Sequence, residues 1–337
     1  MIWTDKIPIN TNIIKKILVI QFQTYSDVFL ASATFETLKK SFPEAELHFL
    51  LKEPFQEIVN DHPYLDNIIS FPIEKNFKYF TSRLKLFHRI NKMKFDIVID
   101  LQNNVGSSQV CLFSGAKYRI GFNDGRLSFV YNYKVLRDSE KYLASQKFDL
   151  LKPLGIIEED WRFHFQIKKQ SHAFIDKWLN EIGLKHKEFM ILSPGSSLPS
   201  KKWRTSFYAS LGDLIVENLG LSVVLIGTKS EQSDCHYTLE HMRNKPFIAP
   251  EMSLNQVAAL LQRARLLVCN DGALNQFSCA TETQTIAIFG NTFPMQKSPA
   301  SIASHHHHLF KEDYPSKTDD SFGISPQDVM NKIKEIL

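Results

Sequence analysis

The sequence predicts an α/β protein built from two doubly wound halves, each with its own parallel sheet. Short runs of leucine and β-branched residues alternate with longer amphipathic segments. This alternation occurs twice, once in each half of the 337-residue chain. The length is also that of about two domains of ordinary size.

Four runs in the first half are predominantly apolar, as expected for strands covered by helices on both faces. Helical spacing separates them, at 27–42, 54–61 and 82–93. Because parallel strands need crossover connections, this order predicts a parallel sheet with right-handed crossovers. The four runs are 16–21 (KILVIQ), 46–52 (ELHFLLK), 68–72 and 96–101 (DIVIDL).

The second half repeats this order, with helical spacing at 206–219 and 253–264. A charged helical segment, 167–187, separates the halves, so we expect a first domain at 1–170 and a second at 171–337. The last helix, 326–337, could pack on either half. The strands are expected at 189–193 (FMILS), 222–227 (SVVLIG), 266–270 (LLVCN) and 285–290 (TIAIFG).

Composition and missing motifs exclude several functions. The net charge of +4 without a basic run argues against a nucleic-acid binder, but suits an anionic small molecule or a lipid headgroup surface. No apolar stretch is long enough to span a bilayer, and the N-terminus lacks a signal core, which predicts a cytoplasmic protein. The four scattered cysteines are expected to be reduced. G-x-G-x-x-G, Walker, H-E-x-x-H and G-x-S-x-G motifs do not occur.

Ligands of open parallel sheets bind beyond the carboxyl ends of the strands, and two facing sheets would leave a cleft there. The first loop of this kind is QFQTYSD, which leads from the first strand into a helix. Its Asp27 lies in the first helical turn, where a carboxylate is favoured by the helix dipole. Asp27 is therefore either a capping residue or a general base.

The loop after the first strand of the second half reads SPGSSLPSKKW. Ser196 and Ser197 offer hydroxyl and backbone donors, and Lys201 and Lys202 add positive charge. This combination predicts a seat for a diphosphate. The alternative is a solvated loop in which Trp203 is a packing anchor.

Two further loops of the second half carry candidate ligand contacts. Glu231 follows a strand end, where a carboxylate either accepts from ribose hydroxyls or caps a helix. The loop NDGALNQ contains Asp271, Gly272, Ala273 and Gln276, and its small residues expose backbone N–H groups to an anion.

Two charged stretches lie outside these loops. Four consecutive histidines at 305–308 do not share one face of a helix or strand, so we expect an exposed loop that binds metals only adventitiously. The stretch Lys75–Lys94 is basic and aromatic. It is either a membrane-facing segment near anionic headgroups or an ordinary amphipathic helix with a basic outer face.

Taken in order over residues 15–336, these segments resemble glycosyltransferase family 9, the ADP-heptose:lipopolysaccharide heptosyltransferases. The resemblance includes the first strand and turn, with the helix that ends in Phe-Pro, and several later motifs. Their order and spacing are more specific than any one motif. The later motifs are NDHPY, FDIVIDLQN, GAKYRIGF, SPGSSLPSKKW, VVLIGTKSE, LLQRARLLVCND and IAIFGNT.

The resemblance implies a GT-B fold with the acceptor in the first lobe and the donor nucleotide in the second. It implies an inverting transfer without a metal or other cofactor. By match to the family motifs, Asp27 is the general base, Lys201 neutralises the departing diphosphate, and Glu231 contacts the nucleotide ribose. Asp271 matches the Asp of the family's Asp-[Ser/Thr]-Gly-x-x-His loop.

This chain departs from the family pattern in the Gly-Asp turn and in the Asp-[Ser/Thr]-Gly-x-x-His loop. Ser26 replaces the Gly before the catalytic Asp, Gly272 replaces the Ser or Thr, and Gln276 replaces the His. Gln276 can donate a hydrogen bond but carries no charge. The substitutions put the strength of donor binding and the identity of the sugar in question.

The expected function is transfer of a heptose or a related sugar from an ADP-sugar to a membrane-anchored lipopolysaccharide core saccharide. The acceptor would be presented at the inner face of the cytoplasmic membrane, with peripheral membrane contact. One alternative is a GT-B transferase with a UDP- or GDP-sugar donor. The other is a catalytically degenerate protein that binds a glycan or a partner enzyme.

Overall fold

The computed structural model describes residue 9 and residues 13–73, 76–157, 161–312 and 319–337. Lys75, the first residue of the basic aromatic stretch, lies outside these residues. The chain divides into two compact units, Met1–Phe165 and Gln166–Leu337, each with its own sheet. No helix among the described residues is both long enough and apolar enough to cross a bilayer.

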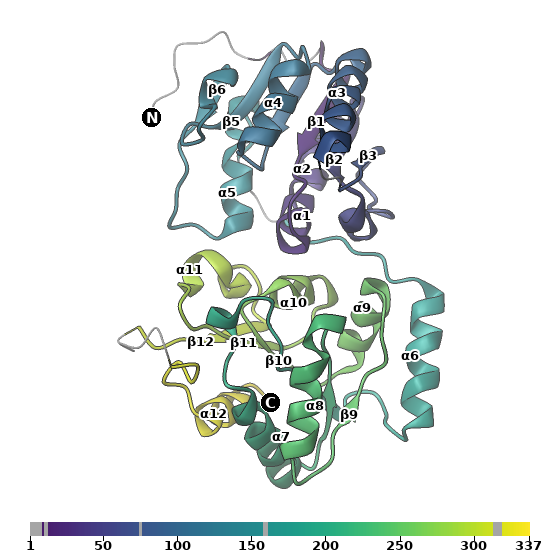
Figure 1. Cartoon of the computed structure of the whole chain (residues 1–337), viewed down its shortest axis with the longest axis vertical. Coiled ribbons are helices and arrows are strands. Elements are labelled where there is room, and N and C mark those ends of the chain that lie inside the picture. Colours follow the sequence, from purple (N-terminus) through teal and green to yellow (C-terminus); the bar gives the residue numbers. More distant parts are fainter. Residues whose placement is uncertain (1–8, 10–12, 74–75, 158–160, 313–318) are drawn as a thin grey trace. The chain divides into compact units, whose positions relative to one another are not determined.

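The described part of the first unit contains a six-stranded parallel sheet in the order β3-β2-β1-β4-β5-β6 (Figure 1). β1 and β4 lie at its centre and are almost wholly buried, which explains their unbroken apolar runs. The strands are β1 (Lys16–Ile20), β2 (Glu46–Lys52), β3 (Asn67–Phe71), β4 (Ile97–Asp100), β5 (Tyr118–Phe122) and β6 (Tyr133–Val135).

Helices cover both faces of this sheet. α3 and α4 lie side by side on one face (Figure 1), and right-handed crossovers put α1 and α2 on the other, where α1 contacts α5. The predicted helix 27–42 is interrupted at Ala33, and 54–61 is largely a 3₁₀ helix at Glu53–Ile58. The helices are α1 (Tyr25–Ser32), α2 (Thr34–Ser41), α3 (Asn76–Met93), α4 (Val105–Phe113) and α5 (Leu143–Asp149).

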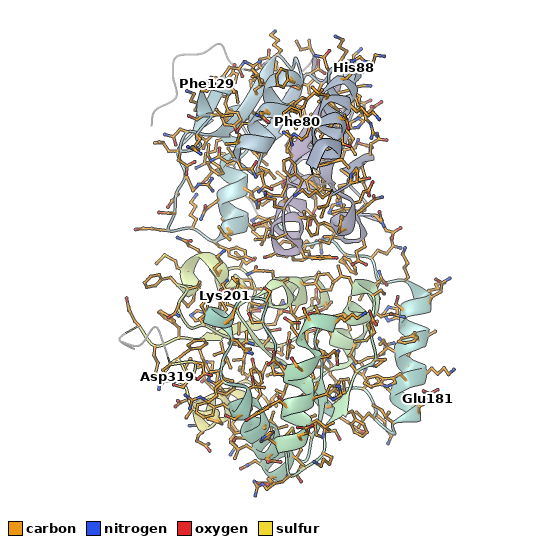
Figure 2. All side chains as sticks on the ribbon, in the orientation of Figure 1. Phe80, His88, Phe129, Glu181, Lys201 and Asp319 are labelled. Carbon is orange, nitrogen blue, oxygen red and sulfur yellow. The ribbon has the colours of Figure 1, made fainter. Side chains whose placement is uncertain are left out.

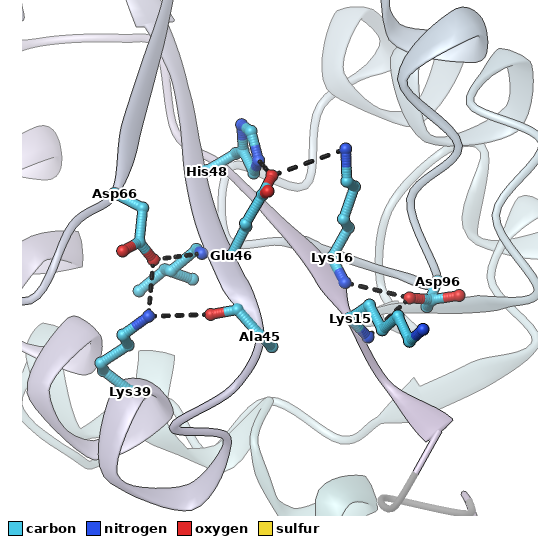
Figure 3. A network of polar contacts seen from close by, with 9 residues as sticks. Lys15, Lys16, Lys39, Ala45, Glu46, His48, Asp66 and Asp96 are labelled. Carbon is cyan, nitrogen blue, oxygen red and sulfur yellow. Dashed lines mark hydrogen bonds and ion pairs between the residues drawn. The ribbon is translucent and has the colours of Figure 1, made fainter.

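Polar contacts hold the amino ends of four neighbouring strands in the first sheet (Figure 3). Asp66, just before β3, accepts a hydrogen bond from the backbone N–H of Leu47 in β2 at 2.7 Å. Asp96, just before β4, accepts from the N–H groups of Lys15 and Lys16 at 2.8 and 3.0 Å. Each carboxylate therefore satisfies backbone donors where a neighbouring strand begins.

The second unit has a six-stranded parallel sheet in the order β12-β11-β10-β7-β8-β9, with β7 and β10 at its centre. All eight strands predicted from the sequence are present, and the prediction of parallel sheets is confirmed. The strands are β7 (Phe189–Ser193), β8 (Ser222–Leu225), β9 (Phe247–Ile248), β10 (Leu267–Asn270), β11 (Thr285–Ile288) and β12 (His306–Leu309).

Two groups of helices enclose this second sheet. α7 packs against α8 and α12, and α6 packs against α9. The final helix buries Val329, Met330 and Ile333 in the core of the second unit. The helices are α6 (Lys169–Glu181), α7 (Thr205–Leu219), α8 (Gln232–His241), α9 (Leu254–Arg263), α10 (Ala273–Phe277), α11 (Pro294–Lys297) and α12 (Pro326–Ile336).

The prediction that the four histidines form an exposed loop is wrong. Three of them begin β12, whose register pairs His306 with Thr285 of the apolar strand β11. His306 is only 3% exposed, and its Nε2 lies 3.3 Å from Cys279 Sγ. The partner strand, which local sequence does not reveal, provides the hydrogen bonds that make this polar run a strand.

Burial of His306, together with its neighbours His305 and His307, lowers its pKa to about 3 from an ordinary value of 6.5. The unfolded chain therefore takes up a proton at a higher pH than the folded chain does. The stability contributed by neutral His306 is complete above pH 6.5 and is lost as the pH falls through this window towards 3.

We expect His306→Gln to remove about 1.4 kcal/mol per pH unit from the pH dependence of the free energy of unfolding within this window. Urea unfolding of the full chain at a series of pH values measures the slope. His236→Gln, at an exposed position, is the control. An unchanged slope in His306→Gln would show that other groups cause the acid sensitivity.

Candidate functional site

In each sheet, the first three strands follow one another towards one edge and the next three towards the other edge, so the strand order reverses at one position. This position lies between β1 and β4 in the first unit and between β7 and β10 in the second. Loops that leave the carboxyl ends of these strands diverge there and leave room for a ligand. The predicted site residues Lys201 and Asp271 lie on such loops, and Asp27 lies in the first turn of α1, directly after the loop that follows β1.

In the first unit, Gln102 organises the loop that follows β1. Its Oε1 accepts hydrogen bonds from Gln21 Nε2 at 2.5 Å and from the N–H groups of Phe22 and Gln23 at 3.1 Å each. Its Nε2 donates to Gln23 Oε1 at 2.8 Å. One side chain from the β4 loop thus fixes the course of the β1 loop that leads to Asp27.

Asp27 is half-buried and is held by Thr24, the N-cap residue of α1. Thr24 Oγ1 accepts from the Asp27 N–H at 3.1 Å and donates to Asp27 Oδ2 at 2.8 Å. Thr24 has a positive φ of 53°, a conformation that costs energy for a β-branched residue. Asp27 thus takes part in capping α1, as one of the two alternatives predicted, and the contact with Thr24 also fixes the orientation of its carboxylate.

A buried carboxylate at the end of β4 holds the backbone of the β4 loop. Asp100 is inaccessible to solvent, and its Oδ1 accepts from the N–H groups of Gln102 and Asn103 at 3.0 and 2.9 Å. Tyr131 donates its hydroxyl to Asp100 Oδ2 at 2.7 Å. Burial raises the pKa of Asp100, while these donors oppose that rise.

In the second unit, three loops meet at one buried carboxylate. Lys201 is labelled in Figure 2, and its Nζ lies 2.6 Å from Asp271 Oδ2. Thr292, from the loop after β11, donates its hydroxyl to the same oxygen at 2.7 Å. Asp271 is 3% exposed, so these two partners compensate a charge that is otherwise costly to bury.

Asn270, the last residue of β10, ties the β7 loop in place. Its Nδ2 donates to the carbonyls of Gly195 and Pro194 at 2.8 and 3.2 Å, and its Oδ1 accepts from the Trp203 N–H at 2.9 Å. Trp203 is fully buried, and its indole N–H donates to the Ile324 carbonyl at 2.9 Å. Trp203 is thus the predicted packing anchor, and it holds the loop that carries Lys201.

Glu231 packs directly against Gly195. Its carboxylate accepts from the Thr228 N–H at 2.8 Å and the Thr228 hydroxyl at 2.7 Å, which is the capping arrangement. A Cβ added at Gly195 would lie 2.5 Å from Glu231 Cβ. The absence of a side chain at Gly195 therefore lets the β7 and β8 loops approach each other closely.

We expect Gly195→Ala to destabilise the protein by about 1–3 kcal/mol because the methyl group would collide with Glu231. Urea unfolding measures this cost. Adding Glu231→Gly removes the opposing Cβ, so the double variant should lose less stability than the two single variants together. Additive losses would show that the close approach is not the cause.

The remaining predicted residues differ in exposure. Gly272, Ala273 and Ser197 are exposed and Ser196 is half-buried, whereas Gln276 is 2% exposed. Gln276 Nε2 donates to the backbone carbonyl of Lys297, as does Asn275 Nδ2 at 3.3 Å. Gln276 therefore ties α10 to the end of α11.

Sequence reasoning missed Gln102, Asn270 and Thr292 as site residues. All three lie at or beyond the carboxyl end of a parallel strand, namely β4, β10 or β11. The rule that led to Asp27 and Lys201 applies equally to them. The available signal was a polar residue directly or shortly after an apolar run, as the last residue of LQ, CN and GNT.

The chain is similar to known proteins over most of its length. A family model described as Glycosyltransferase family 9 (heptosyltransferase) matches residues 83–321. Lipopolysaccharide heptosyltransferase 1 of Campylobacter coli is 21% identical, and the match covers 95% of this chain and 98% of that protein.

Two solved structures share the fold. The family 9 glycosyl transferase from Veillonella parvula superposes with a TM-score of 0.83 at 22% identity, covering 96% of this chain and 97% of that one. E. coli heptosyltransferase WaaC with ADP-2-deoxy-2-fluoro heptose gives a TM-score of 0.74 at 18% identity, covering 96% and 100%. The prediction of a GT-B α/β fold is confirmed.

Proposed function

This chain belongs to glycosyltransferase family 9, and we propose that it transfers a heptose or a related sugar from an ADP-sugar to a lipopolysaccharide core saccharide. The similar Campylobacter protein is named lipopolysaccharide heptosyltransferase 1, and the similar WaaC structure contains ADP-2-deoxy-2-fluoro heptose. These names support the proposed donor and acceptor. The acceptor is membrane-anchored, and the reaction takes place at the cytoplasmic face of the inner membrane.

The pair of Lys201 and Asp271 carries this proposal. A nucleoside diphosphate gains negative charge as its bond to the sugar breaks, and a fixed cation stabilises that charge more in the transition state than in the ground state. Lys201 is a cation held at the carboxyl edge by Asp271, 2.6 Å away. Thr292 shares the carboxylate, so Lys201 can turn towards a phosphate without leaving Asp271 unpartnered.

The other donor contacts follow from the same edge of the second sheet. Ser196, Ser197, Gly272 and Ala273 would offer hydroxyl and backbone donors to the diphosphate. Glu231 would accept from the ribose hydroxyls while it remains bound to Thr228. No metal or cofactor takes part in this proposal.

Asp27 is the proposed general base. An acceptor hydroxyl has a pKa far above neutral, so a carboxylate must take its proton as its oxygen attacks the anomeric carbon. The bond to the diphosphate breaks, the electron pair leaves with the phosphate oxygen, and the configuration inverts. Thr24 and the loop fixed by Gln102 would hold Asp27 ready for this step.

A second candidate, a binding protein without catalysis, is favoured by Gln276. The family has a histidine at this position, whereas here an uncharged side chain is bound to the carbonyl of Lys297. Such a protein would keep the fold and recognise a glycan or a partner enzyme. Nucleotide binding separates the two candidates.

A thermal-shift titration of the full chain with ADP, UDP, GDP and CMP tests the donor. A ligand that binds only the folded state at about 100 times its Kd adds about 2.7 kcal/mol of stability. We expect selective stabilisation by ADP, followed by sugar transfer from ADP-heptose. A preference for UDP or GDP would change the donor, and no shift with any nucleotide would favour the binding protein.

A further inference from the structure

One surface of the first unit exposes large apolar side chains that a globular protein normally buries. Phe80 and Leu84 on α3 are 69% and 61% exposed, and Leu112 and Phe113 at the end of α4 are 45% and 50% exposed. Phe87 joins the two helices, because its ring lies 4.8 Å from that of Phe113. We call these five residues the α3–α4 face.

Cations border this face along α3. Lys85, Arg89 and Lys92 repeat at helical spacing and are exposed, and so is His88, which Figure 2 labels together with Phe80. These cations lie next to the stripe formed by Phe80 and Leu84. The sequences of α3 and α4 contain no Asp or Glu, although the whole chain has 36 acidic residues.

We propose that the α3–α4 face docks on the surface of a bilayer that contains anionic phospholipid. The apolar side chains would enter the boundary between headgroups and acyl chains, while the bordering cations would pair with lipid phosphates. Exposed aromatic and aliphatic groups beside a cationic stripe that contains no carboxylate match this boundary in both polarity and charge. A bilayer offers an apolar layer of acyl chains beneath a layer of anionic phosphates. A partner protein of ordinary composition would instead present carboxylates and amides to this face.

The position of α4 connects this face to the candidate site. α4 begins at its N-cap Asn104, directly after the β4 loop that carries Gln102, and its first residue Val105 is 42% exposed. The face therefore extends outward from the carboxyl edge of the first sheet. A lipid-anchored acceptor would reach that edge from the same membrane, a consequence that rests on the proposed function.

Sedimentation of the full chain with phosphatidylcholine vesicles, with and without phosphatidylglycerol, tests the inference. We expect binding only to the anionic vesicles, with loss of binding at high salt. Lys85→Gln with Arg89→Gln should weaken binding by about 25-fold, or about fivefold for each cation. Phe80→Ser with Leu84→Ser should weaken it by about tenfold or more.

Helix α6 of the second unit provides matched controls, since it exposes Phe174 but carries Asp176 and Glu181. Phe174→Ser, and Lys169→Gln with Lys177→Gln, should bind vesicles as the parent chain does. Binding that is equal on both vesicle types, or weakened equally by the control variants, would overturn the proposal. A dimer that Phe80→Ser dissociates, without vesicle binding, would assign the face to self-association instead.

Transfer to a water-soluble acceptor saccharide separates this inference from the proposed function. The α3–α4 variants should keep the parent rate, because they alter membrane contact alone. Vesicle binding without any transfer would count against the proposed function and leave the docking surface standing. Transfer without vesicle binding would support the proposed function and overturn the docking surface.

Discussion

Lys201→Met is expected to lower kcat by about 10²–10³-fold, because it removes the cation that would meet the departing diphosphate. It also leaves Asp271 buried with a hydrogen bond from Thr292 but without its ion-pair partner. We expect a stability loss of about 1–3 kcal/mol, less than for a fully buried pair because the Lys201 side chain is 19% exposed. Steady-state kinetics and urea unfolding measure the two effects.

The double variant Lys201→Met with Asp271→Asn separates stability from catalysis. It removes the uncompensated carboxylate, so stability should return towards that of the parent chain while kcat stays low. If restoring stability also restored transfer, Lys201 would be a structural residue. Lys201→Arg keeps the charge and should retain part of the activity.

Asp27→Asn is expected to lower kcat by about 10²–10⁴-fold, the usual contribution of a general base. An asparagine oxygen can still accept a hydrogen bond from Thr24, so the melting temperature should change little. Donor binding, measured by thermal shift with ADP, should be unchanged because the loops proposed to bind the donor lie in the other unit. Unchanged turnover in this variant would reject Asp27 as the base.

Thr24→Ala is the matched control for Asp27, since it removes the cap and leaves the carboxylate. It should cost about 1 kcal/mol of stability. If the capping contact were the whole role of Asp27, Thr24→Ala and Asp27→Asn would have similar effects on turnover. A far larger loss in Asp27→Asn assigns the carboxylate a role beyond the cap.

Strands buried on both faces were predictable because such strands are predominantly apolar. The runs KILVIQ and FMILS became β1 and β7, and their order predicted parallel sheets. Three strands that escaped prediction, β6, β9 and β12, are short or polar and lie at the edges of the sheets. β9 has two residues and β12 is largely histidine, so each depends on a neighbouring strand that local sequence does not reveal.

The candidate site was predictable in part for a similar reason. Asp27 and Lys201 were found because loops that follow parallel strands share one edge of a sheet. The ion pair of Lys201 with Asp271 was not predicted, since it joins residues 70 positions apart. Neither was the contact of Gly195 with Glu231, because it depends on how closely two loops approach.

The acidic residues that bind the strand starts of the first sheet affect which parts of the chain can be mutated without unfolding it. Asp66 and Asp96 satisfy backbone donors at the strand starts, whereas Asp27 and Gln102 lie beyond the opposite ends. Diversity introduced into the loops therefore leaves the bracing contacts intact. A directed-evolution library confined to those loops should contain mostly folded clones, and if these loops bind the acceptor as proposed, acceptor preference is the property most open to redesign.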